Sequence, residues 1–289
     1  MRNWSEMMDI QMIILDLIHR KIIDSKLIEF EKLNGGTISE LYLLNSKGSK
    51  YVVKLNEPKV IESEAHFLHS YKDSNLLPKL LFVEQSYKYI VYSFIDGATN
   101  YNRKDKKDML KALVQGLLNH YKSVPDIGWG WMDQPAVSWQ CFLKNKILEA
   151  NKLIDSRLEI GDHHFVLKLV EEIKTDRKPY LLHGDCGVHN FIFNDGRLIG
   201  VIDPTPVIGE PLYDLIYAFC SSPDDLTKET LDSAVSEWMI KSEHNHPFLY
   251  LEVMIGLYLR LGTCIKHHPQ DFEEYLTAWH YWKNIIKKL

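Results

Sequence analysis

The chain has 289 residues, of which 45% are hydrophobic and 25% are charged, and its formal net charge is -5 at pH 7. This composition is typical of a folded globular enzyme and excludes a mainly disordered chain. The lack of a basic excess argues against nucleic acid as a partner. The length is near the size at which one core commonly divides, so we expect two lobes.

The four cysteines are widely spaced and form no C-x-x-C pair, which disfavours a zinc site and a secreted disulfide framework. We therefore expect a cytoplasmic protein. The first predicted helix, roughly Trp4 to Lys21, has apolar residues at amphipathic spacing, but Asp9 and Asp16 interrupt the apolar run. It is predicted to be a packing helix, and we expect neither a signal peptide nor a membrane partner.

Strand signals dominate the part of the chain that follows this helix. Apolar runs bounded by turn residues predict strands at Leu27 to Leu33, Glu40 to Asn45, Tyr51 to Leu55, Lys79 to Glu84 and Tyr87 to Phe94. One helix, at about Ile61 to Tyr71, is predicted between the third and fourth strands. These elements predict a small antiparallel sheet, and we place the end of this N-lobe at Gly97, so that it comprises residues 1–97.

From residue 98 onward the apolar spacing is mostly helical. Helices are expected at about Lys104 to Lys122, Trp139 to Ser156, Asp162 to Lys174, Asp224 to Ile240, His246 to Lys266 and Pro269 to Lys288. One hairpin, Phe191 to Phe193 and Leu198 to Ile202, is the only β structure expected among them. A strand-rich N-lobe and a helical C-lobe, residues 98–289, make a two-lobed α+β fold in which a small ligand is expected in the cleft between the lobes.

The stretch LLHGDCGVHNFIFNDGRLIGVIDP surrounds this hairpin and carries two histidines, three aspartates and two asparagines between apolar runs. Its His183-Gly184-Asp185 followed by Asn190 has the form H-x-D-x-x-x-x-N, the pattern of a kinase catalytic loop. An aspartate there can accept the proton of a substrate hydroxyl. The amide oxygen of Asn190 and the carboxylate of Asp203 are hard oxygen ligands suited to Mg²⁺ that bridges ATP phosphates.

The other parts of a kinase site occur in the expected chain order. Lys54 lies in a predicted strand, from which an inward lysine can reach phosphates, and Glu64 lies on the following helix, where it can hold that lysine. Glu62 is the less suitable partner because Glu64 shares its spacing with apolar residues of the inner face. Gly35 and Gly36 allow backbone N–H groups to approach phosphate closely.

Each of these residues alone has an ordinary structural explanation, such as a solvated lysine or a glycine turn, and only their common order favours a kinase. A different class remains open, in which His183, Asp185, His189 and Asp203 hold a transition metal in a hydrolase. A third possibility is a catalytically inactive scaffold that binds ATP. The retained lysine, aspartates and asparagine argue against that scaffold.

The chain resembles the aminoglycoside phosphotransferase and choline kinase group, relatives of the protein kinases, from about Ile28 to the C-terminus. The resemblance depends mainly on LLHGDCGVHNFIF and on LIGVIDP followed by GEPLYDLIYAF. It implies a protein kinase-like fold and transfer of the γ-phosphate of ATP, or of GTP, to a hydroxyl group. Within the group, DIGWGWMDQPAVSWQCFL and the C-terminal segment are similar to hygromycin B phosphotransferase, which implies an antibiotic-resistance activity.

The resemblance also implies individual roles. Asp185 matches the catalytic base, Asn190 and Asp203 match the magnesium ligands, and Lys54 paired with Glu64 matches the phosphate contact. Ser93 and Ile95 match the hinge whose main chain contacts the base of the nucleotide. His183 matches a structural position that braces the loop, and Asp214 matches a buried carboxylate that supports it.

Two positions depart from the family pattern. Pro204 stands where an aromatic residue is usual after the metal aspartate, and His189 stands where many members have glycine. We assign no role to His189. Neither Pro204 nor Cys186, which occupies an apolar position, removes a needed oxygen ligand, so nucleotide chemistry is still expected.

The identity of the acceptor is left open between an antibiotic, choline, an amino acid and a sugar, and the oligomeric state is also open. Residues 203–289 contain thirteen acidic residues against seven basic ones. Their densest clusters are Asp224-Asp225 and Asp271-Phe272-Glu273-Glu274. Should these groups line the acceptor site, their field would favour a cationic acceptor.

Overall fold

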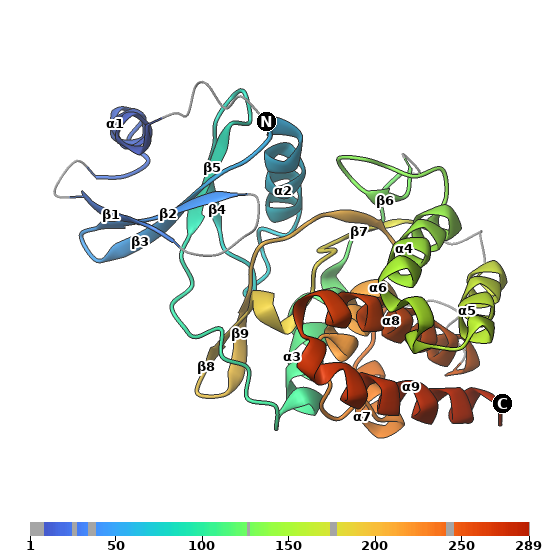
Figure 1. Cartoon of the computed structure of the whole chain (residues 1–289). Coiled ribbons are helices and arrows are strands. Elements are labelled where there is room, and N and C mark those ends of the chain that lie inside the picture. The colour runs from blue at the N-terminus through green and yellow to red at the C-terminus, as the bar shows by residue number, and fades with distance from the viewer. Residues whose placement is uncertain are drawn as a thin grey trace. The chain divides into compact units, whose positions relative to one another are not determined.

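The computed structural model describes residues 9–24, 28–33, 39–125, 128–173, 178–240 and 246–288. The chain divides into two compact units. The first consists of Met1–Lys72 and Pro78–Ile95, and the second consists of Asp73–Leu77 and Asp96–Leu289. The first unit is built on a sheet, and the second is mainly helical (Figure 1).

The first unit contains an antiparallel sheet with the strand order β1-β2-β3-β5-β4. Its strands are β1 (Ile28–Lys32), β2 (Glu40–Ser46), β3 (Ser49–Leu55), β4 (Leu80–Val83) and β5 (Tyr89–Ser93). These are the five strands that the sequence predicts, so the small antiparallel sheet is confirmed. The register places Lys54 of the central strand opposite Leu41 on one side and Ile90 on the other.

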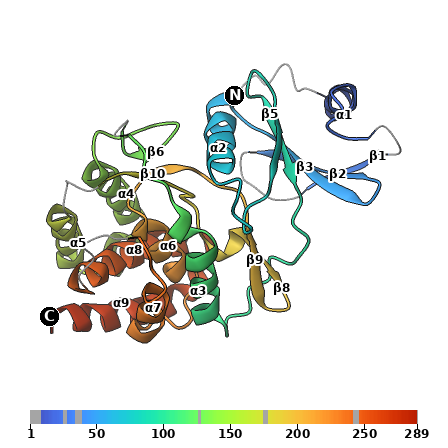
Figure 2. The same ribbon diagram turned by 180° about the vertical axis from the view of Figure 1, so that it is seen from behind.

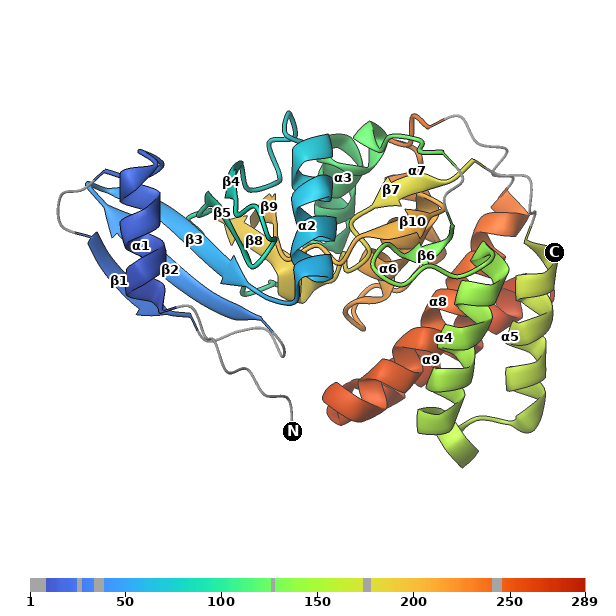
Figure 3. The ribbon, with the colours of Figure 1, turned by 90° about the horizontal axis from the view of Figure 1, so that it is seen from above.

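One helix packs on each face of this sheet. The helix α1 (Ile10–His19) lies over β1 and β2 (Figure 3), and its Ile13 and Leu17 share an apolar core with Val53. Successive strand residues point to opposite faces, so Lys54 points away from α1. It meets the helix α2 (Pro58–Ser70), whose Glu64 is its ion-pair partner.

The second unit is dominated by helices. They are α3 (Lys106–Gly116), α4 (Trp139–Ile154), α5 (Ile160–Glu172), α6 (Leu212–Cys220), α7 (Lys228–Val235), α8 (His246–His267) and α9 (Phe272–Ile286) (Figure 2). The helix α8 contacts α4, α5, α6 and α9 and forms the centre of this helical layer. Trp279 and Trp282 of α9 are completely buried in its core.

The central helix α8 contains the one described segment, Phe248–His267, that is long and apolar enough by composition to cross a membrane. More than half of that segment, 56%, is buried inside the fold. Its length and composition are therefore those of a core helix that is covered by other helices.

The β structure predicted for the second unit needs one correction. The hairpin β8 (Phe191–Asn194) and β9 (Arg197–Val201) is present, but it is not the only β structure. The strands β6 (Gly130–Trp131), β10 (Val207–Gly209) and β7 (Tyr180–Leu182) form a second small sheet. Strands of two or three residues are too short to show an alternating pattern, and their partners are far apart in the sequence.

The helix lengths also differ from the prediction. The helix expected at Asp224 to Ile240 is α7 and covers only Lys228–Val235, and α3 ends at Gly116 instead of continuing to Lys122. The helix α6 was not predicted from apolar spacing, although the resemblance of GEPLYDLIYAF to the family implies a helix start at this place. Its nine residues are mostly apolar and buried, and an apolar run of that length does not by itself distinguish a helix from a strand.

Candidate active site

The predicted catalytic loop connects β7 to the one-turn helix η3 (Val188–Asn190), which leads directly into β8. The two strands are held by neighbours in different sheets, so both ends of the loop are fixed. A backbone hydrogen bond from Ile202 to the carbonyl of Asn190, 2.9 Å long, joins the far strand of the hairpin to η3. The loop therefore brings His183, Asp185, Asn190 and Asp203 to one end of the hairpin.

His183 braces the start of the loop. Its side chain is fully buried, its Nδ1 accepts a hydrogen bond from the Asp185 N–H at 3.3 Å, and its Nε2 lies 3.1 Å from the carbonyl of Ile202. Burial lowers the pKa of His183 to about 4, so the ring is neutral near pH 7. Both ring nitrogens are used inside the loop, which makes this residue a structural brace.

Asp214, near the N-terminus of α6, holds the backbone of the same loop. Its carboxylate accepts hydrogen bonds from the N–H groups of His183 (2.8 Å) and Gly184 (3.0 Å) and from the hydroxyl of Tyr121 (2.5 Å). Burial raises the pKa of Asp214 to about 7. Gly184 has a φ of +81°, and a Cβ there would lie 2.0 Å from the carbonyl oxygen of Thr205. Only glycine fits this turn.

The loop carries the Asp185 carboxylate, which is the base predicted from the sequence. It is partly exposed and lies 2.8 Å from Nδ2 of Asn190 and 3.2 Å from Nε2 of His189. Burial alone would raise the pKa of Asp185, but the His189 ring, aided by the Tyr217 hydroxyl, outweighs burial and holds this pKa well below its usual range. Asp185 is therefore ionised and able to accept a proton from a bound hydroxyl.

Asn190 and Asp203 are the two residues predicted to bind magnesium. Nδ2 of Asn190 donates to the backbone and side chain of Asp185, which orients its amide oxygen as the remaining donor atom. Asp203 follows β9 with a φ of +58°, a region that aspartate tolerates better than most residues. An amide oxygen and a carboxylate suit a hard cation such as Mg²⁺, so this pair fits the metal that the sequence implies.

The alternative metal site of the hydrolase interpretation does not fit the geometry. His183 uses both ring nitrogens on neighbouring backbone groups. Within the described part of the chain, no group of three or more His, Cys, Asp or Glu side chains is arranged to hold a metal ion.

In the first unit, Lys54 and Glu64 form a buried ion pair. Nζ of Lys54 lies 2.5 Å from Oε2 of Glu64, and the two side chains are 3% and 1% exposed. Glu62, the less suitable partner, is exposed. Removing two charges from water costs free energy unless the two groups are well oriented toward each other. The pairing with Glu64 fixes the Lys54 ammonium group on one face of the sheet.

The other residues predicted to contact the nucleotide are Gly35, Gly36, Ser93 and Ile95. Gly35 and Gly36 lie outside the described residues. Ser93 ends β5, and its N–H and Oγ are both engaged with the backbone of Lys79, at 2.9 and 2.8 Å. Ile95 is half-buried at the end of the first unit.

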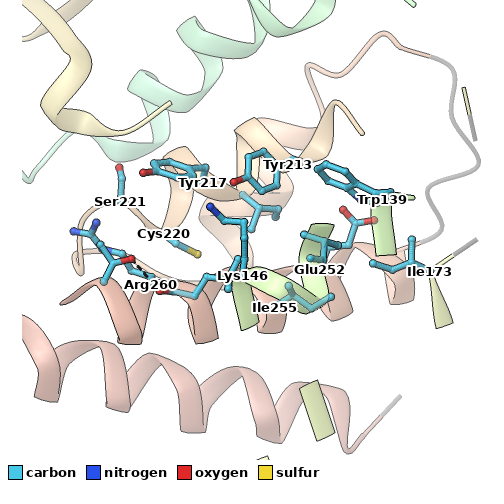
Figure 4. Close-up of a pocket in the computed structure, with 15 residues that line it drawn as sticks. Trp139, Lys146, Ile173, Tyr213, Tyr217, Cys220, Ser221, Glu252, Ile255 and Arg260 are labelled. Atoms are coloured by element: carbon cyan, nitrogen blue, oxygen red, sulfur yellow. Dashed lines mark hydrogen bonds between the residues drawn. The ribbon is translucent and has the colours of Figure 1, made fainter. Parts of the chain in front are cut away.

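A pocket that the sequence analysis did not identify opens beside the catalytic loop in the second unit. Its wall is formed by α4, α6 and α8, and includes Trp139, Lys146, Tyr213, Tyr217, Ser221 and Arg260 (Figure 4). Ser221 Oγ accepts a hydrogen bond from the N–H of Val188 at 3.2 Å. Since Tyr217 also interacts with Asp185, two pocket residues contact the loop directly.

The sequence gives little local signal for this pocket, because its wall combines three distant segments, residues 139–146, 213–221 and 252–263. The one signal available was the aromatic and tyrosine content of SWQCFL and PLYDLIYAF. A Cβ on Gly256 would lie 2.3 Å from Cγ2 of Ile216, so glycine permits the close approach of α8 to α6 that forms the pocket.

The fold and the loop together define a kinase-like phosphotransferase. Residues 29–239 match the model of the phosphotransferase enzyme family, and the chain belongs to that family. This confirms the predicted family and the predicted activity class, a phosphotransferase that acts on a hydroxyl of a small molecule. No curated protein has a matching sequence.

Solved structures of similar fold include three that illustrate the range of the family. A thermostable mutant of aminoglycoside phosphotransferase APH(4)-Ia, in complex with ADP and hygromycin B, is 16% identical with a TM-score of 0.59, covering 94% of this chain and 97% of that one. A putative aminoglycoside phosphotransferase from Ralstonia eutropha is 13% identical with a TM-score of 0.62, covering 93% and 97%. A putative fructosamine-3-kinase from Thermobifida fusca is 14% identical with a TM-score of 0.58, covering 91% and 98%. At these identities the likeness shows the kinase-like fold.

Proposed function

We propose that the protein transfers the γ-phosphate of ATP to a hydroxyl group of a small acceptor, with Mg²⁺ as cofactor. The observation that carries the proposal is the arrangement of Asp185 with Asn190 on one loop, because Nδ2 of Asn190 lies 2.8 Å from the carboxylate. One side chain orients the base and also offers an oxygen for a cation. A structural neighbour in complex with ADP supports nucleotide use, and GTP is the alternative donor.

In this proposal Asp185 accepts the proton of the acceptor hydroxyl as that oxygen bonds to the γ-phosphorus. The bond between the γ-phosphorus and the bridging oxygen breaks, and ADP leaves with the electron pair. Asn190 and Asp203 would hold Mg²⁺, which neutralises charge on the phosphates when it is bound. Lys54, fixed by Glu64, would contact the nucleotide phosphates.

The remaining residues position these groups. His183 and Asp214 fix the loop backbone, so that the Asp185 carboxylate is presented in one orientation. Ser93 and Ile95 would offer hinge contacts to the nucleotide base, and Gly35 and Gly36 would approach its phosphates. We assign nucleotide binding to residues 1–97 and the catalytic loop with the acceptor pocket to residues 98–289, and we propose that the enzyme acts in the cytoplasm.

The compound that receives the phosphate has several candidates. An aminoglycoside-like antibiotic is one candidate, supported by the structural neighbour that holds hygromycin B. Choline, an amino acid or a sugar are the others, and the sugar candidate is supported by the fold shared with fructosamine kinases. We assign the pocket beside the catalytic loop to this acceptor, because Tyr217 and Ser221 connect its wall to the loop that carries Asp185.

The test combines thermal unfolding with a coupled assay for ADP over a panel of hydroxyl compounds. MgATP at about one hundred times its dissociation constant should stabilise the protein by roughly 2.7 kcal/mol, and at least one compound should release ADP stoichiometrically. A shift with zinc but none with millimolar nucleotide would favour the hydrolase. Tight MgATP binding without turnover of any compound would identify an inactive scaffold.

A further inference from the structure

The pocket beside the catalytic loop contains two basic side chains. Lys146 comes from α4 and Arg260 from α8. Figure 4 shows the Lys146 ammonium group pointing toward Tyr213 and Tyr217, and the Arg260 guanidinium on the side of Ser221. Tyr217 and Ser221 are the pocket residues that contact the catalytic loop. The two positive charges therefore lie at the end of the pocket that is nearest to Asp185.

Lys146 is held in this position without a carboxylate partner among the described residues. Its Nζ lies 4.7 Å from the centroid of the Trp131 ring and 5.5 Å from that of Phe142. These cation–π contacts hold the ammonium against an aromatic wall. Burial lowers the pKa of Lys146, and the charges of Glu149 and Asp185 oppose that effect only in part. Burial removes water from the Lys146 ammonium group, and an anion bound in the pocket would compensate for that loss of solvation.

Arg260 also has no ion-pair partner within the described part of the chain. Its Nε donates to the hydroxyl of Tyr275 at 2.9 Å, and its guanidinium carbon lies 5.3 Å from the centroid of that ring. The Nε contact fixes the plane of the guanidinium group. The terminal N–H groups form the fork that binds a carboxylate or phosphate through two hydrogen bonds.

The acidic clusters of the second unit do not balance this charge. Asp224 accepts a hydrogen bond from Tyr101 at 2.9 Å, and Asp271 pairs with Arg103 at 3.3 Å. Neither residue, nor Asp225, is part of the pocket wall. The carboxylate in the wall, Glu252, lies toward Trp139 and Ile173 in Figure 4, at the end away from Arg260.

We propose that the acceptor is a hydroxyl compound that carries an anionic group, a carboxylate or a phosphate, bound between Lys146 and Arg260. This inference rests on the proposed function, since it assigns a charge to the acceptor of that reaction. It reverses the expectation of a cationic acceptor, because the acidic clusters on which that expectation depended lie outside the pocket. A polycationic aminoglycoside would place its amino groups against two fixed positive charges.

The inference is tested with three benzyl alcohols that differ only in charge: para-(hydroxymethyl)benzoate, its neutral benzamide and the cationic benzylamine. Their aromatic rings match the aromatic wall of the pocket. Calorimetric titration into the wild-type protein saturated with magnesium and a non-hydrolysable ATP analogue measures binding without turnover and keeps the charge of Asp185, which acts on Lys146. The benzoate should bind about tenfold or more tightly than the benzamide, the value of one charge-assisted hydrogen bond, and the benzylamine should bind most weakly. A preference for the benzamide or the benzylamine, or no binding by the benzoate, overturns the inference.

Two substitutions test the assignment to residues. Lys146→Met and Arg260→Gln should each weaken benzoate binding by about tenfold and leave benzamide binding within about twofold. The matched control is Lys144→Met on the same helix, whose ammonium pairs with Glu171 at the surface, and it should leave all three probes unchanged. The charge reversal Lys146→Glu should move the preference from the benzoate to the benzylamine. If Lys146 had only a structural role, the charge reversal would not move the preference from the benzoate to the benzylamine.

Failure of the anionic-acceptor inference can be distinguished from failure of the proposed kinase function, because binding of MgATP is measured independently in each variant. Phosphorylation of neutral or cationic hydroxyl compounds alone, with MgATP affinity intact, would contradict the anionic acceptor and leave the kinase in place. Loss of MgATP binding in the wild-type protein would contradict the kinase itself.

Discussion

Nζ of Lys54 lies 2.5 Å from Oε2 of Glu64, and both side chains are almost completely excluded from solvent. Removing one partner of a buried ion pair leaves the other charge without compensation, which commonly costs about 3–5 kcal/mol. Glu64→Gln keeps the shape and part of the dipole, so the free energy of unfolding in urea should fall by roughly 2–3 kcal/mol.

The same variant should raise the KM for MgATP, because the lysine is no longer fixed. Glu62→Gln, two residues earlier on the exposed side of α2, is the matched control and should change stability by less than about 0.5 kcal/mol. Equal effects of the two substitutions would contradict the structural role of the pair.

Asp185→Asn should lower kcat by about two to four orders of magnitude, because it removes the proton acceptor while preserving the shape of the loop. The dissociation constant of MgATP should change by less than about threefold, since the variant leaves the proposed phosphate contacts in place. Turnover is measured by ADP release with an identified acceptor. Wild-type turnover in this variant would show that Asp185 is not the base.

Asp203→Asn should weaken the binding of MgATP by about tenfold or more, because an amide is a poorer magnesium ligand than a carboxylate. Titrations of nucleotide at several magnesium concentrations separate a metal effect from a direct nucleotide effect. Asp195→Asn is the control, since Asp195 lies exposed in the turn of the same hairpin and also has a positive φ. If both variants bound MgATP equally, Asp203 would not be a metal ligand.

The pH dependence of stability should carry the signature of His183. Burial lowers its pKa in the folded protein to about 4, below the ordinary value of about 6.5. Between these values the unfolded chain binds a proton that the folded chain does not, so stability rises with pH. The stabilising contribution is present above about pH 6.5 and is lost as the pH falls toward 4.

Integrated over that window, the contribution is roughly 3 kcal/mol. Urea unfolding from pH 4 to 7 in the wild-type protein and in His183→Gln measures it as a difference in slope, with His280→Gln on the exposed side of α9 as the control. Parallel pH profiles for wild type and His183→Gln would contradict the neutral, buried ring.

Lys106 should contribute to stability through the C-terminus of α6. Its buried ammonium donates to the carbonyls of Phe219 (3.0 Å) and Ser222 (2.8 Å) and to the carbonyl of Asp224. Burial lowers its pKa to about 8. Lys106→Met should reduce the free energy of unfolding by about 2 kcal/mol or more, because it leaves buried carbonyls unsatisfied.

The neighbouring Lys107 pairs with Glu229 at the surface, and Lys107→Met should change stability by less than about 0.5 kcal/mol. Chemical denaturation of the two variants side by side provides the measurement. A loss in Lys106→Met no larger than in Lys107→Met would show that the carbonyls find other partners.

Groups that are close together in the chain were predictable from the sequence. The strands of the first unit show alternating or continuous apolar runs that depend only on local spacing, and these five strands were predicted. The loop residues His183, Asp185 and Asn190 lie within eight positions, so their pattern was readable without any knowledge of the fold. The family, which rests on that pattern, was predicted for the same reason.

Only the tertiary structure decided the features that combine distant segments. The sheet of β6, β7 and β10 pairs strands of two or three residues, and such strands carry no period of their own. The helix α6 is a buried, mostly apolar run of nine residues, and a run of that length does not by itself distinguish a helix from a strand. The pocket combines segments that are still further apart, since Lys146 and Arg260 both line it although 114 positions separate them in the chain. The number of acidic residues along the sequence suggested an acidic acceptor site, because such a count includes every acidic side chain wherever it lies. In the fold, Asp224 accepts a hydrogen bond from Tyr101 and Asp271 pairs with Arg103, and neither lines the pocket. The two basic side chains do line it.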